Sequence, residues 1–73
     1  MKDLGDPAAA LAPLRRGVSC RPEDFELQLA LGETLLEAGH LQEAQTHLEN
    51  AHRLDAKDAR PGQALERLRK KKR

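Results

Sequence analysis

The fold is decided by residues 25–58, which read FELQLALGETLLEAGHLQEAQTHLENAHRLDAKD. The apolar residues before Gly39 cover more than one side of a helix, which the sequence predicts from about Pro22 to Ala38. From Leu41 to Leu54 the apolar side chains recur at steps of three and four, the spacing that keeps them on one face of a helix. Gly39 separates the two patterns, and glycine closes a helix easily because it adopts the left-handed conformation. The stretch therefore predicts a hairpin of two helices.

Weaker helix signals flank this hairpin on both sides. Upstream, Asp6 and Pro7 suit the start of a helix, but Pro13 interrupts the pattern and predicts a kinked, weak or late-starting helix. Downstream, a fourth helix is predicted to begin between Ala59 and Pro61 and to dissolve into the basic residues 69–73. Helix-forming residues dominate throughout and no segment has the composition of a strand. We expect an all-α domain, an antiparallel array of about four helices.

Length and cysteine content place the chain in a broad class. Its 73 residues fit one domain, 1–73, and a chain of this size has modest stability. Cys20 is alone, so no disulfide forms within the chain, and a reducing compartment is expected. The sequence shows neither an apolar signal segment nor a run of about 18 apolar residues. We expect a soluble protein, cytoplasmic or nuclear, with no membrane contact.

Charge is balanced overall at +1 but is unevenly distributed. Residues 22–52 contain seven acidic side chains and no lysine or arginine. From Lys57 onward basic side chains dominate, ending in Arg69-Lys70-Lys71-Lys72-Arg73. The middle of the chain is acidic and its end is basic.

The sequence resembles itself at an offset of about 34 residues, a period typical of helix-turn-helix repeats. Equivalent pairs at this offset are Ala10 and Ala44, Leu14 and Leu48, Gly17 and Ala51, Cys20 and Leu54, Asp24 and Asp58, and Leu31 and Leu65. In these residues the chain resembles the tetratricopeptide repeat family. The resemblance implies a full repeat at 25–58, the second helix of a partial repeat at 7–21 and a C-terminal capping helix with a basic tail at 59–73.

Particular residues carry this resemblance. Leu31-Gly32 matches the Leu-Gly pair of the family's first helix, and Ala44, Leu48 and Ala51 match the spine of its second helix. Small side chains at Gly32, Ala44 and Ala51 would let the two helices approach closely. Departures from the pattern are Gln28 and Leu35, where the family has large aromatic residues, and Ala56, where it has a closing proline.

The sequence offers little catalytic or metal chemistry. No two of His40, His47 and His52 are three or four residues apart, the spacing that helical metal ligands need, so no metal is expected and the histidines are interpreted as surface and turn residues. Cys20 has no base beside it in the sequence and is interpreted as an inert, buried thiol. No phosphate loop, nucleophile motif or cofactor fingerprint occurs. We expect neither an enzyme nor a cofactor.

The resemblance implies that the first helices of successive repeats line a concave groove that binds a peptide or a partner helix. The groove residues it implies are Glu26, Leu29, Ala30, Glu33 and Glu37 on one helix and Arg60, Gln63, Ala64, Arg67, Lys70 and Lys71 on the next. One wall is then acidic and the other basic. Leu29 and Glu33 stand where members that clamp the acidic tails of chaperones have Lys and Asn, so the expected ligand carries both signs of charge, or is basic.

Two further hypotheses remain open. The uneven charges and the unaccompanied end helices, with Leu11 and Leu14 lacking evident cover, predict salt-sensitive association of the chain with itself or packing against a larger partner. The alternative is pairing of these charges within one chain. The basic end also suits nuclear import or contact with nucleic acid, although no aromatic residue interleaves it for base stacking.

Overall fold

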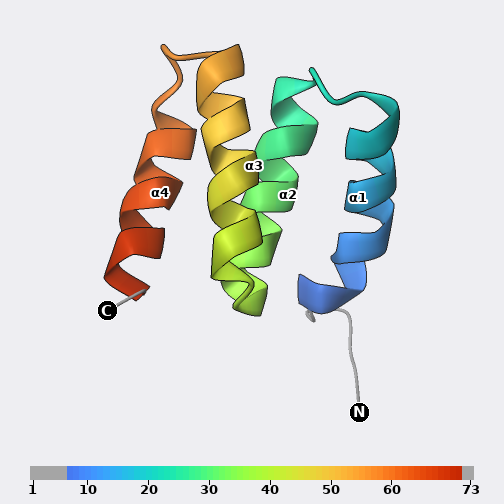
Figure 1. Cartoon of the computed structure of the whole chain (residues 1–73), viewed down its shortest axis with the longest axis horizontal. Helices are drawn as coiled ribbons and strands as arrows, with labels where there is room; N and C mark the ends of the chain where they lie inside the picture. Colours follow the sequence, from blue (N-terminus) through green and yellow to red (C-terminus); the bar gives the residue numbers. More distant parts are fainter. Residues whose placement is uncertain (1–6, 72–73) are drawn as a thin grey trace.

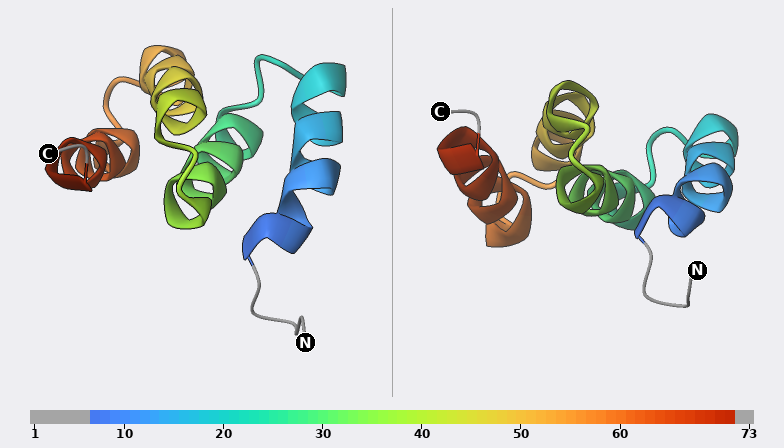
Figure 2. Two further views of the ribbon diagram at one scale, coloured as in Figure 1. Left: turned by 60° about the horizontal axis from the view of Figure 1, so that its bottom comes forward. Right: turned by 90° about the horizontal axis from the view of Figure 1, so that it is seen from below.

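The computed structural model describes residues 7–71, and all of its regular elements are helical. A short 3-10 helix, η1 (Pro7–Ala10), leads into α1 (Leu11–Cys20), α2 (Phe25–Ala38), α3 (Leu41–Leu54) and α4 (Ala59–Lys71). Each α-helix runs antiparallel to the one before it (Figure 1). Viewed along the helices, the four form a staggered row in which α2 and α3 are central (Figure 2). The predicted all-α array of four helices is confirmed.

The late start of α1 follows from Pro13. The α-helix begins only at Leu11, after the 3-10 turn, so Pro13 is its third residue. The first four amide hydrogens of an α-helix have no intrahelical partner, so proline costs no hydrogen bond there. The proposed cap, Asp6, lies outside the described residues, and Ala10 at the start of α1 provides no side-chain cap.

The boundaries of α2 are set by two residues. Asp24 caps the start, where its Oδ1 accepts a hydrogen bond of 3.1 Å from the amide of Leu27. The predicted start at Pro22 is therefore too early, because Pro22 lies in the turn before the helix. Gly39 ends α2 with φ of +92°, as its left-handed preference predicts.

The core forms where α2 packs against α3. Gly32 of α2 faces Leu48 of α3 so closely that a Cβ at Gly32 would meet Cγ of Leu48 at 2.7 Å. The predicted close approach is thus confirmed. The buried apolar side chains are Leu11, Val18, Leu29, Leu31, Leu35, Leu36, Ala44, Leu48, Ala51, Ala64 and Leu68.

Both ends of the array differ from expectation. Leu11 is buried and Leu14 packs against the core, so the predicted lack of cover for these two residues is wrong. Cys20 is exposed, which contradicts the expected buried thiol. At the other end α4 continues through Arg69 and Lys70 to Lys71, so these basic residues are helical.

No helix within residues 7–71 is long and apolar enough to cross a membrane.

Candidate functional site

The two halves of the structure repeat each other at an offset of 34 residues. Cys20 and Leu54, which end α1 and α3, are separated by this offset, and so are Phe25 and Ala59, which begin α2 and α4. The turns agree as well. The amide of Asp24 donates to the carbonyl of Arg21 at 3.1 Å, and the equivalent amide, that of Asp58, donates to the carbonyl of Asp55 at 3.2 Å.

This register places α2 and α4 in equivalent positions, and their outward side chains form one surface, here called the α2/α4 face. It comprises Glu26, Ala30, Glu33 and Glu37 of α2 with Arg60, Gln63, Arg67, Lys70 and Lys71 of α4. All of these are exposed except Ala30 and Glu33, which are half-buried. Leu29 and Ala64, also expected in the groove, are each only 2% exposed and belong to the core instead.

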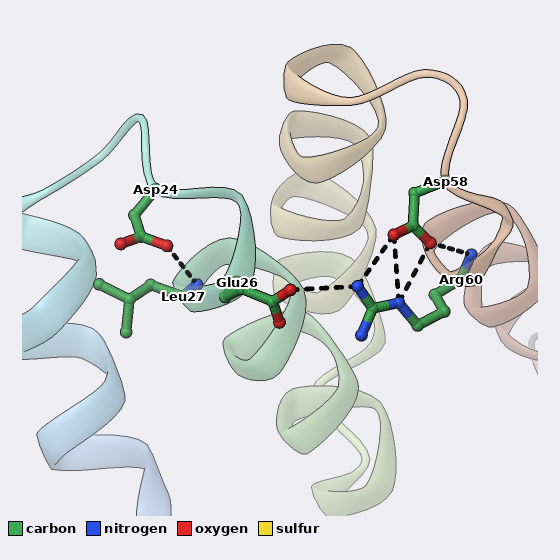
Figure 3. A network of polar contacts seen from close by, with 5 residues as sticks. All are labelled: Asp24, Glu26, Leu27, Asp58 and Arg60. Carbon is green, nitrogen blue, oxygen red and sulfur yellow. Dashed lines mark hydrogen bonds and ion pairs between the residues drawn. The ribbon is translucent and has the colours of Figure 1, made fainter.

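Equivalent positions on the two helices carry opposite charges. At the 34-residue offset Glu26 corresponds to Arg60, Glu33 to Arg67 and Glu37 to Lys71. The first of these pairs is in contact: Nη2 of Arg60 lies 3.1 Å from Oε2 of Glu26. The α2/α4 face therefore has an acidic helix beside a basic one, bridged at the end where both helices begin (Figure 3).

Arg60 is held in place by more than Glu26. Its Nη2 is 2.9 Å from Oδ2 of Asp58, its backbone amide donates to Oδ1 of Asp58 at 2.9 Å, and its guanidinium carbon lies 5.5 Å from the centre of the Phe25 ring. Hydrogen bonds from Arg60 lower the pKa of Asp58. The pKa of Arg60 is raised, first by its hydrogen bonds to Asp58 and second by its hydrogen bond to Glu26. The bridge is nevertheless solvated, because the side chains of Arg60 and Glu26 are 50% and 71% exposed, and its strength is screened by salt.

The remaining charges of the α2/α4 face are not used within the described part of the chain. Among residues 7–71 the ion pairs join Arg15 to Glu43, Arg21 to Asp24, and Arg60 to Glu26 and Asp58. None of these pairs includes the other five charged side chains of the face, namely Glu33, Glu37, Arg67, Lys70 and Lys71.

A second bridge joins α1 to α3 and was not anticipated. The guanidinium of Arg15 donates to both carboxylate oxygens of Glu43, at 2.5 and 3.0 Å. The hydrogen bonds raise the pKa of Arg15 and lower that of Glu43. The residues are 28 positions apart, and no local spacing signals such a pair.

Sequence reasoning also missed a polar contact inside the hairpin. Gln28, only 4% exposed, donates from Nε2 to the carbonyl of Pro22 at 2.8 Å. Its Oε1 lies 2.8 Å from Nδ1 of His47. Because an amide oxygen only accepts hydrogen bonds, the tautomer of His47 with its proton on Nδ1 donates this one. His47 is half-buried rather than a surface residue, and burial lowers its pKa. The signal available in the sequence was the polar Gln28 at a position where related repeats have a large apolar ring.

Other candidate sites do not coincide with this face. Within residues 7–71 there is no group of three or more His, Cys, Asp or Glu side chains arranged to hold a metal ion. One hollow of about 300 Å³ is lined by Pro22, Glu23, Gln28, Asn50, Arg53 and Leu54. Another, of about 240 Å³, lies between α3 and α4 beside Leu65 and Leu68. Neither of these two hollows is lined by a residue of the α2/α4 face.

Comparisons with known proteins agree with the repeat geometry. The family model described as tetratricopeptide repeat matches residues 2–68. No curated protein and no solved structure matches the chain. Tetratricopeptide repeats are in general protein–protein interaction modules. Given a match over most of its length, the chain belongs to the tetratricopeptide repeat family.

Proposed function

We propose that this chain is a non-catalytic scaffold or adaptor module that holds a peptide or a helix of a partner protein against the α2/α4 face. In this proposal residues 25–58 form the full repeat, 7–21 the second helix of a partial repeat and 59–73 the capping helix with its basic tail. The module works without a cofactor. The single cysteine favours a reducing compartment, the cytoplasm or nucleus.

One observation carries the proposal. Among the described residues, the Glu26–Arg60 ion pair is the only one formed between α2 and α4 on this face. Glu33 and Glu37 correspond to Arg67 and Lys71 but form no ion pair with them. Charges of both signs on neighbouring helices favour a ligand that presents basic groups to α2 and acidic groups to α4. Leu29 supports the ligand only indirectly, from the core.

The test is a selection of binding peptides on the intact chain, followed by binding measurements with two variants. Glu33→Lys combined with Glu37→Lys should weaken binding at least about tenfold, because like charges then face the basic groups of the ligand. The control is Glu49→Lys, an exposed change on α3, which should leave binding unchanged. Equal loss in both variants, or in neither, would remove the α2/α4 face as the binding surface.

A nucleic-acid role would use the basic side of α4 alone. Arg67, Lys70 and Lys71 are exposed there and could contact phosphates, whereas Phe25 is occupied by Arg60. A gel-shift assay at two salt concentrations separates the two functions, since phosphate contacts weaken steeply with salt. Absence of a shift at low salt would eliminate this alternative.

A further inference from the structure

The α2/α4 face is its own electrostatic complement. We infer that one partner of this face is a second copy of the same chain, bound face to face about a two-fold axis that runs parallel to α2 and α4. The inference rests on the proposed function, because it uses the same surface, and it specifies the partner.

Both α2 and α4 run from the same end of the molecule (Figure 1), and at that end the equivalent residues Glu26 and Arg60 are in contact at 3.1 Å. The face therefore has an acidic column and a basic column that are parallel and in register. Opposite charges at equal height are Glu33 with Arg67 and Glu37 with Lys71.

Homodimers form most readily about a two-fold axis, and the same patch is then used on both copies. Turning a second copy about an axis parallel to the helices lays its α2 over α4 of the first copy, in the same direction and at the same level. Glu33 of each copy then faces Arg67 of the other, and Glu37 faces Lys71. Turning it about an axis across the helices would lay α2 over α2 and oppose like charges. Charge complementarity selects the first arrangement.

Glu26 and Arg60 already pair with each other, and the guanidinium is also held by Asp58, just before α4, and by Phe25, the first residue of α2. That bridge occupies the charges at one end of the face. Glu33, Glu37, Arg67 and Lys71 take part in no ion pair among residues 7–71, so they remain for the other copy. Ala30, a small and half-buried residue between Glu26 and Glu33, leaves room for the two surfaces to approach.

The experiment uses two charge variants of the whole chain. Glu33→Lys with Glu37→Lys makes both columns basic, and Arg67→Glu with Lys71→Glu makes both acidic. Sedimentation of the wild-type chain at rising protein concentration should reveal a dimer whose dissociation constant increases at least about tenfold between low and high salt. Each variant alone should be monomeric. Circular dichroism should show that each retains its helices, since three of the four substituted side chains are exposed and Glu33 is half-buried.

Mixing the two variants is the decisive step. The basic columns of one then meet the acidic columns of the other, and a one-to-one dimer should return. A chain carrying all four reversals should also dimerise like the wild type. A wild-type chain that stays monomeric at low salt, variants that still dimerise alone, or a mixture that remains monomeric would each overturn the inference. Selected peptides that bind in any of these cases would leave the proposed function standing by itself.

Discussion

Leu48 is the side chain around which the hairpin closes. It is completely buried and lies against Gly32 across the contact between α2 and α3. Leu48→Ala should cost about 2–5 kcal/mol of unfolding free energy, through lost burial and the cavity left behind. Urea denaturation measures this loss. Leu54→Ala, at a side chain that is 40% exposed, is the control and should cost about 1 kcal/mol or less. Similar losses in the two variants would contradict the assigned core.

Gly32 and Gly62 form a matched pair for testing the close approach. Both lie within helices, where replacing glycine by alanine normally stabilises by up to about 1 kcal/mol. At Gly62 nothing lies within 4 Å of an added Cβ, whereas at Gly32 that atom would meet the Leu48 side chain at 2.7 Å and its backbone amide at 3.2 Å. Gly62→Ala should therefore raise the melting temperature, and Gly32→Ala should destabilise by about 1–3 kcal/mol. Stabilisation by Gly32→Ala would exclude the close contact.

His47 gives the fold a dependence on pH. Burial lowers the pKa of His47 below the ordinary value of 6.5. The negative charge of Glu43 raises this pKa, and the positive charge of Arg15 lowers it further. Because the pKa of His47 is lower in the folded chain, the unfolded chain binds the proton more readily. The contribution of neutral His47 to the free energy of unfolding is therefore complete above pH 6.5 and is lost as the pH falls through the folded pKa. The urea midpoint should fall on acidification from pH 7.5 to about pH 5.5. The fall should be smaller in His47→Gln, and equal falls in the two proteins would contradict a role for His47.

Among single residues, the sequence predicted the close helix contacts that need small side chains. It did not predict hydrogen bonds between side chains far apart in the sequence. Gly32, Ala44 and Ala51 were identified as close-packing positions because only small side chains allow it. The hydrogen bond between Gln28 and His47 joins residues 19 positions apart, and no local pattern indicates it. Cys20, which is equivalent to Leu54 in the repeat, was expected to be buried because it was assigned to a core position of its helix. Both of these residues are exposed.

At the scale of elements, the start of α2 depends on one cap. The Oδ1 of Asp24 accepts the amide hydrogen of Leu27, which would otherwise lack a partner. Asp24→Ala should cost about 0.5–2 kcal/mol, measured by thermal unfolding. Asp55→Ala, at an exposed residue that follows α3, is the control and should be nearly neutral. A neutral Asp24→Ala would show that the cap does not stabilise α2.

Helix boundaries were predictable where glycine, or a change of apolar pattern, marks them. Gly39 and the break after Leu54 gave the ends of α2 and α3 correctly. The start of α2 was predicted three residues too early, at Pro22, because proline suits the turn before a helix as well as its first position. The end of α4 was placed too early, since a basic run is compatible both with a solvated tail and with the last turn of a helix, where cations interact favourably with the dipole.

At the scale of the whole molecule, the repeat period determined how helices far apart in the sequence meet. An offset of 34 residues places α4 beside α2 and brings Arg60 to Glu26. The acidic and basic columns of the face were therefore predictable from the sequence. The Arg15–Glu43 bridge was not, because it joins helices through positions that are not equivalent in the repeat.

A partner that binds to the α2/α4 face should change the amide chemical shifts of the residues on that face. The isotope-labelled chain would be titrated with a peptide selected for binding to the wild type. The largest changes should occur at Glu33, Glu37, Arg67 and Lys70, which share that face, with little change at Arg15 and Glu43, which bridge α1 and α3. Changes centred on Arg15 and Glu43, with the α2/α4 face unaffected, would contradict the account.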